Sequence, residues 1–181
     1  MPENTDISVI RLDNVRLSFP HLFTANAMQE GQEKKFSATF LMDTEKHKDL
    51  IGKIEKTIER LALDKWKKKI SFKQCLRDGE EKEGTDGYGE GVRFLSASKK
   101  TRPNVVDRNM DPLIEEDGKI YAGCYVNASI RLWVQDNQYG KRVNAELRTV
   151  QFVKDGESFG VAPCKPTDDF GPLGQDDIDS F

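Results

Sequence analysis

Regular alternation of apolar and polar residues over positions 121–134 constrains the fold of this chain more than any other feature of its sequence. Valine, alanine, isoleucine and leucine occupy the even positions from 126 to 134, whereas the odd positions carry mostly polar or aromatic side chains. A period of two residues is typical of a β-strand that buries one face. We therefore predict a strand with one face in a hydrophobic core and the other at the surface.

The odd-numbered face of this strand carries Tyr125, Arg131 and Trp133, with small polar residues between them. Aromatic rings stack on bases and an arginine neutralises a phosphate, so this mixture suits single-stranded nucleic acid. An ordinary exposed sheet face also accepts aromatic residues, because they favour the strand conformation. The strand alone does not distinguish these two interpretations, and other segments must decide between them.

The remaining periodic segments favour a mainly β fold with a single helix. Further strands are predicted at residues 9–19, 35–42, 92–100, 142–153 and 158–162. The first has Val15, Leu17 and Phe19 on one face and is expected to end at Pro20, before a loop whose Leu22 and Phe23 plug the core. Five to seven strands interrupted by one helix favour a mainly antiparallel barrel over βαβ repeats.

The helix is predicted over residues 45–69, where apolar residues recur at spacings of three and four. Asp43 and Thr44 are candidate N-caps. Lysines at 65 and 67–69 suit either a phosphate-contacting patch or the negative end of a helix dipole, and we favour the second interpretation. The next segment, 75–91, is rich in glycine and acidic residues and is predicted to be a long mobile loop. It lacks the GK[ST] sequence of a phosphate-binding P-loop.

Charge is distributed unevenly along the chain. The net charge of −3 argues at first against a nucleic-acid partner. However, residues 165–181 contain one lysine and five aspartates, a net charge of −4, which leaves +1 for residues 1–164. Acidic residues within 78–90 form a second local cluster. We therefore predict a largely basic domain over 1–164, followed by an acidic tail, 165–181, with too few apolar residues to fold.

Cysteine and histidine usage argues against a disulfide framework or a zinc site. The three cysteines, at 75, 124 and 164, are widely spaced, and the chain has only two histidines. We expect no metal and no cofactor. No apolar run approaches the roughly 20 residues that a membrane span requires. The first twelve residues lack the pattern of a secretory signal, so we expect a cytoplasmic protein.

Six segments spread over nearly the whole chain resemble the small single-stranded DNA-binding proteins of tailed bacteriophages, which coat DNA during phage replication. They are RLSFPHLF (16–23), FSATFLM (36–42), LRDG (76–79), KKTRPNVVD (99–107), IYAGCYVNASI (120–130) and the ending DDIDSF. The resemblance implies an OB-fold barrel that binds single strands by stacking and by a basic groove. It also implies an acidic tail that contacts replication proteins such as DNA polymerase or helicase, and no catalysis.

Two sets of functional residues follow from the resemblance and from side-chain chemistry. The DNA-binding candidates are Tyr121, Tyr125, Arg131, Trp133, Lys99, Lys100 and Arg102, with Tyr88 and Phe94 as further stacking candidates. The partner-binding candidates in the tail are Asp176, Asp177, Asp179 and Phe181. Phe94 also suits a core position. The tail charges could occupy the DNA groove when DNA is absent, and a tail that only improves solubility is the simpler alternative.

We therefore expect a nonenzymatic phage protein that binds and protects single-stranded DNA with little sequence preference during replication, recombination or repair. The enzymatic alternative is a metal-dependent nuclease that uses Asp78, Glu80 and Glu81. These carboxylates crowd one glycine-rich segment without a dispersed acidic set or a nearby catalytic lysine, which disfavours it. The second alternative is a protein-interaction or virion-assembly module whose exposed aromatic residues contact protein.

Overall fold

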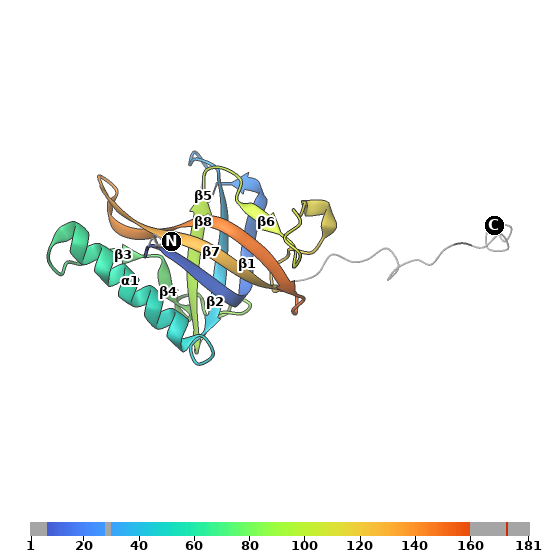
Figure 1. The fold of residues 1–181 in the computed structure, drawn as a ribbon, viewed down its shortest axis with the longest axis horizontal. Coiled ribbons are helices and arrows are strands. Elements are labelled where there is room, and N and C mark those ends of the chain that lie inside the picture. The colour runs from blue at the N-terminus through green and yellow to red at the C-terminus, as the bar shows by residue number, and fades with distance from the viewer. Residues whose placement is uncertain (1–6, 28–29, 160–172, 174–181) are drawn as a thin grey trace, which may run out of the picture.

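Five long strands form a closed barrel, and shorter strands extend its sheet (Figure 1). The structure is a computed structural model that describes residues 7–27, 30–159 and 173. The barrel strands are β1 (Val9–Asn26), β2 (Lys35–Asp43), β5 (Val92–Lys99), β7 (Tyr125–Asn137) and β8 (Gly140–Lys154). They pair antiparallel in the order β8-β7-β1-β2-β5, and a parallel bridge between β5 and β8 closes the barrel. This connectivity confirms the mainly β, OB-fold-like barrel.

The predicted alternation in β7 is confirmed, because the even-numbered side chains from 126 to 132 enter the core, Val134 packs against it, and the odd-numbered side chains face outward. Val126 and Ile130 are completely buried, and β1 and β8 supply many of the other core residues. The strand begins at Tyr125 rather than at residue 121. The reason is a turn before it, in which the Cys124 N–H donates to the Tyr121 carbonyl and Gly123 has a φ of 109°.

The first strand continues through Pro20 instead of ending there. Its pairing with β2 shifts register between Ser18 and His21, and a proline is tolerated in a strand where the ladder is interrupted in this way. Beyond the irregularity Leu22 enters the core and Phe23 packs against it, as predicted. The predicted loop over residues 20–32 is therefore wrong for its first part, which belongs to β1.

Among the described residues there is one α-helix, α1 (Lys48–Trp66). It lies along one side of the barrel, away from the segment that follows β6 (Asn104–Val106) (Figure 1). It begins later than predicted because Asp43 Oδ1 accepts from the N–H groups of the next turn, which leaves His47 at the N-cap position. The buried face that packs on the barrel consists of Ile51, Ile54, Ile58 and Ala62. Within the described part of the chain, no helix has the length and apolar character needed to cross a membrane.

Residues 75–91 are not the long mobile loop that their composition predicted. They contain β4 (Leu76–Asp78), which pairs with β5, and a 3₁₀ turn, η1 (Gly79–Lys82), and they fold back across the outer face of β2 and β5. The Gly89 N–H donates to the Gly79 carbonyl and closes the segment on itself. The segment is ordered because it packs on Phe94. This apolar side chain points outward from β5, and the segment shields it from water.

Three shorter elements complete the fold. They are β3 (Lys73–Gln74), β6 (Asn104–Val106) and the 3₁₀ turn η2 (Glu115–Asp117). Residues 104–106 were predicted to lie in a loop, but they form β6 and pair with β8. Of the strand predicted at 158–162, residues 158 and 159 are not in a strand, and the others lie outside the described residues.

Burial raises the pKa of the Cys75 thiol to about 12, so this cysteine stays a protonated, unreactive part of the packing at neutral pH.

Candidate nucleic-acid interface

A row of side chains on the outer surface crosses six neighbouring strands at one level. In the strand registers Tyr125 lies opposite Arg16, Arg16 opposite Leu41, and Leu41 opposite Phe94. From β8 to β4 the row consists of Lys154, Tyr125, Arg16, Leu41, Phe94 and Arg77. Adjacent strands are about 4.8 Å apart, so the row brings together residues that are far apart in the sequence.

Four further side chains lie on this row and make its surface more aromatic and more basic. Phe19 lies in β1, shortly after Arg16. Lys82 and Tyr88 come from the segment that covers β5, and Phe159 comes from the chain after β8. We call the combined surface the aromatic band. Its members are Arg16, Phe19, Leu41, Arg77, Lys82, Tyr88, Phe94, Tyr125, Lys154 and Phe159.

One half of the aromatic band is a cluster of three rings around a single lysine. The Tyr88 ring packs edge-on against Phe94 at a centroid distance of 5.1 Å, and Phe19 lies 6.2 Å from Tyr88. The Lys82 Nζ atom lies within 5.3 to 5.6 Å of all three ring centroids. Phe94 is 0% exposed and Phe19 is 49% exposed. Phe19 and Tyr88 therefore form the accessible surface, and Phe94 supports them from below.

Tyr88 is held in place by its hydroxyl group as well as by ring packing. Its O–H donates to the Ser18 Oγ atom at 3.0 Å, and burial raises the pKa of this tyrosine. The hydroxyl therefore remains protonated, and able to donate, at neutral pH. Because the ring is held in place, little side-chain freedom remains to be lost when a base stacks on it.

Phe19 adopts a backbone conformation that a bulky residue rarely uses. Its φ is 44°, in the left-handed region, and half of its side chain is exposed. Strained aromatic residues of this kind concentrate at binding sites, where the surrounding structure maintains them. The alternation of the first strand predicted Phe19 on the buried face. That prediction is wrong, because the irregularity beside Pro20 turns the side chain outward.

The other half of the aromatic band is centred on Tyr125. The Arg16 guanidinium group lies 5.7 Å from the Tyr125 ring centroid, and the Lys154 Nζ atom lies 4.8 Å from it. Two cations therefore flank one half-buried ring.

Tyr121, a second predicted stacking residue, has a different role. Its O–H donates to Asp155 Oδ1 at 2.8 Å, so its hydroxyl anchors the chain that leaves β8.

Arg131 and Trp133 share the outward face of β7 with Tyr125 but lie outside the aromatic band. They are six and eight residues further along the strand, which corresponds to about 20 and 27 Å. Arg131 lies opposite Glu146, and Trp133, 44% exposed, lies opposite Asn144 near the β7–β8 hairpin. The structure therefore does not bring these three predicted DNA-binding residues together at one site.

The predicted basic cluster lies at the far end of β5, beside the loop that connects β1 and β2. The Lys100 Nζ atom is 3.6 Å from a Glu33 carboxylate oxygen, and Arg102 donates from Nη2 to the Phe23 carbonyl. Lys99 is the last residue of β5. Between this cluster and the aromatic band, the outer face of β2 and β5 carries only small hydroxyl side chains. They are Ser37, Thr39, Ser96 and Ser98.

The carboxylates of the nuclease alternative do not converge. Asp78 Oδ1 accepts from the Glu80 N–H group, and Glu81 pairs with Arg77 at 2.9 Å. Among the residues that the structure describes, no group of three or more potential ligands is arranged to hold a metal ion. The tail candidates Asp176, Asp177, Asp179 and Phe181 lie outside the described residues.

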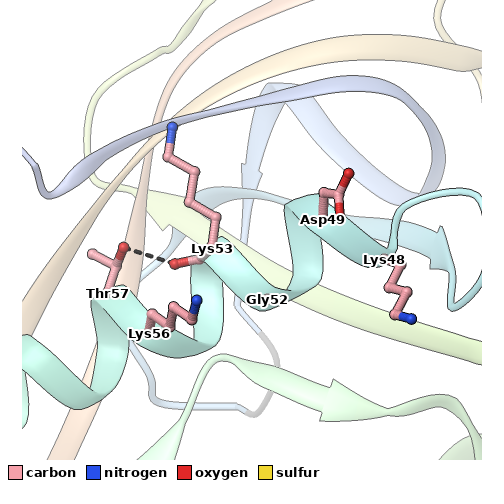
Figure 2. A pocket seen from close by; sticks show the side chains of 6 residues that line it. All are labelled: Lys48, Asp49, Gly52, Lys53, Lys56 and Thr57. Carbon is pink, nitrogen blue, oxygen red and sulfur yellow. Dashed lines mark hydrogen bonds between the residues drawn. The ribbon is translucent and has the colours of Figure 1, made fainter.

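A shallow hollow on the outer surface of α1 is built from a single helix (Figure 2). It is open at Gly52, where an added Cβ atom would meet nothing within 4 Å, and Lys48, Lys53 and Lys56 surround it. The three ammonium groups point in different directions, and Thr57 donates only to the Lys53 carbonyl. Because these groups do not converge on one point, the hollow offers no set of side chains that could hold one ligand together.

Comparison with known proteins identifies the family. The family model of the single-stranded DNA-binding protein of Enterobacter phage Enc34 matches residues 8–181. The chain belongs to this family. A relative from Acyrthosiphon pisum secondary endosymbiont phage 1, named protein p50, is 41% identical over 183 aligned positions, which cover 93% of this chain and 97% of the relative.

Solved structures of Enc34-family proteins have the same fold. The single-stranded DNA-binding protein of bacteriophage Enc34, solved in complex with single-stranded DNA, is 34% identical with a TM-score of 0.77, covering 86% of this chain and 91% of that one. The single-stranded DNA-binding protein gp2.5 of bacteriophage T7 is 14% identical with a TM-score of 0.58, covering 83% and 93%, and supports the fold alone. Membership confirms the predicted phage family, and the family is nonenzymatic.

Proposed function

We propose that this protein binds single-stranded DNA with little sequence preference, and that the aromatic band is the centre of its binding surface. The observation that carries the proposal is the juxtaposition of the accessible rings of Phe19 and Tyr88 with the Lys82 ammonium group. Rings accept any base, and each stacked base contributes roughly 1 to 3 kcal/mol. The family and its solved complex with single-stranded DNA support the same ligand.

The location of the aromatic band agrees with the way OB-folds bind oligonucleotides. These barrels use the outer face of their second and third strands and the adjoining loops. In this protein the second and third barrel strands are β2 and β5. A single strand that leaves the aromatic band across the serine-lined face of β2 and β5 reaches Lys100 and Arg102, where its phosphates meet positive charge. We place the DNA path along this line.

The first experiment is fluorescence anisotropy with labelled oligo(dT) and its duplex counterpart over a series of salt concentrations. We expect a strong preference for the single strand, because only unstacked bases expose a face to the rings. Each phosphate neutralised on a single strand contributes a slope of about −0.7 in log K against log salt. The four cations of the aromatic band together with Lys100 and Arg102 therefore predict a slope of about −4. Absence of binding to either DNA at low salt would contradict the proposal. It would favour the alternative of a protein-docking surface.

We further propose that residues 165–181 act as a regulatory and recruiting tail, in a protein that works on phage DNA in the host cytoplasm. The net charge of −4 competes with DNA phosphates for the basic surface, and bound DNA makes the tail available to a polymerase or helicase. The support is its charge pattern and its aromatic end.

Replacing Asp176, Asp177 and Asp179 with asparagine in the full chain tests the tail. We expect tighter oligo(dT) binding at low salt and a smaller difference at high salt, since the competing charges are removed and salt screens those that remain. The same three-residue variant should also pull down less replication polymerase or helicase from phage-infected cells. Unchanged DNA affinity together with unchanged recruitment would leave only a solubilising role.

A further inference from the structure

The chain that leaves β8 folds back over the start of β7 and is held there by several hydrogen bonds. We call residues 155–159 the strap; it is the orange-red end of the coloured chain in Figure 1. The Gly156 N–H donates to the Tyr121 hydroxyl oxygen at 3.1 Å, and the Phe159 N–H donates to the Ala122 carbonyl at 3.0 Å. The strap therefore has a defined position on the barrel.

Arg16 connects the strap to the aromatic band. Its Nη2 atom donates to the Glu157 carbonyl at 2.7 Å, and its Nε atom donates to the Gly123 carbonyl at 3.1 Å. The strap approaches so closely that a Cβ atom added to Gly123 would lie only 2.1 Å from the Glu157 carbonyl oxygen. The backbone and the guanidinium group together fix the path of the chain up to its last described residue before the tail, Phe159.

Phe159 fills a slot in the aromatic band. Its ring centroid lies 4.3 Å from the Arg16 guanidinium carbon. The tip of the ring lies against Gly87, where an added Cβ atom would come within 2.5 Å of the Phe159 Cζ atom and 2.8 Å of a Leu41 methyl group. The slot is thus bounded by the Arg16 guanidinium group and by Gly87, with Leu41 next to Gly87 and the Tyr125 ring also near Arg16.

We infer that this slot is a nucleobase subsite, and that Phe159 occupies it when no DNA is bound. The inference rests on the proposed function and adds to it a specific site and a competing group. A guanidinium group binds the face of a flat ring, whether the ring belongs to phenylalanine or to a base, and the missing side chain at Gly87 leaves room for the ring. The slot lies between the Tyr125 half and the Phe19 half of the aromatic band, so a strand that follows the band passes over it. The entering base displaces Phe159 and releases the end of the strap.

Phe159→Ala in the full chain tests the competition. We expect oligo(dT) to bind about three- to tenfold more tightly, because the variant no longer has to break a ring contact on arginine before the base enters. Ile114→Ala, which removes an exposed apolar side chain elsewhere, is the control and should leave the affinity unchanged. Equal or weaker binding by Phe159→Ala would overturn the subsite while leaving the proposed function intact. Failure of the wild-type chain to bind would overturn both.

Hydrogen–deuterium exchange on the wild-type protein tests the displacement without any substitution. The Phe159 N–H is bonded to Ala122 in the free protein, so saturating oligo(dT) should make this amide exchange severalfold faster. Amides of β2 and β5 in the same sample should exchange more slowly or at an unchanged rate. An unchanged or slower rate at Phe159 would overturn the inference, because it would mean that the strap stays in place beneath the DNA.

Discussion

Replacing Phe19 with alanine is expected to weaken oligo(dT) binding by roughly five- to 150-fold, the equivalent of the 1 to 3 kcal/mol that one stacked base contributes. The ring is half exposed, contacts the Lys82 ammonium group and forms the accessible edge of the three-ring cluster. The free energy of unfolding should fall by less than for a completely buried phenylalanine, since half of the side chain is exposed. Anisotropy at low salt measures the first quantity, and urea denaturation measures the second.

Met110→Ala provides a matched control for this substitution. Met110 is also a large exposed side chain at positive φ, in its case 70°, but it lies after β6 and contacts Gln151. The control should leave DNA affinity within about twofold of wild type, as is usual for surface substitutions away from a site. If Phe19→Ala bound DNA as tightly as Met110→Ala, the strained aromatic residue would have no part in stacking. The centre of the interface would then have to be placed elsewhere.

Periodicity along each strand was sufficient to predict the barrel, but not the arrangement of its outer surface. The even-numbered residues from 126 to 132 in β7 are buried as predicted, because burial repeats every second residue within one strand. The aromatic band instead runs across strands, where neighbours are set by register. Tyr125 is therefore adjacent to Arg16 and Leu41, which are remote in sequence, and distant from Trp133, which shares its face.

Seven members of the aromatic band were not among the predicted DNA-binding residues: Arg16, Phe19, Leu41, Arg77, Lys82, Lys154 and Phe159. Lys82 and Phe19 show why. Lys82 lies in a segment rich in acidic residues, and that composition does not indicate DNA binding. Its position in the aromatic band becomes visible only in the structure, where the segment packs over Phe94. Phe19 followed the alternation of the buried residues, and only the irregularity at Pro20 reverses its direction. A phenylalanine directly before a proline, within a strand that continues past it, is the sequence signal for such a reversal.

Tyr121 and Phe94 show how a correct residue type can serve a different purpose. Both were candidates for stacking on bases, and both lie at the interface. Tyr121 uses its hydroxyl group to hold the strap, and burial raises its pKa, so this donor persists at neutral pH. Phe94 is buried beneath Tyr88. Each supports a neighbouring group, a role that depends on three-dimensional packing and leaves no pattern in one sequence.

Phe94→Ala is expected to lower the free energy of unfolding by about 3 to 5 kcal/mol, as for other completely buried phenylalanines. The ring lies under Tyr88 and beside the Arg77 guanidinium group, so its removal leaves a cavity beneath the covering segment. Urea denaturation measures this loss. DNA affinity of this variant alone would not reveal a direct contact, because the platform above the cavity would also shift.

Phe94→Leu separates support from direct stacking. It keeps most of the buried volume, so the expected loss of stability is below about 1.5 kcal/mol and the fold remains intact for binding measurements. If Phe94 only supports Tyr88, oligo(dT) affinity should stay within about threefold of wild type, because the exposed surfaces of Phe19 and Tyr88 remain. A loss as large as that of Phe19→Ala would mean that the covering segment opens and that a base reaches Phe94 directly. The pair of substitutions therefore decides whether residues 79–91 are a fixed wall of the binding surface or a flap that DNA displaces.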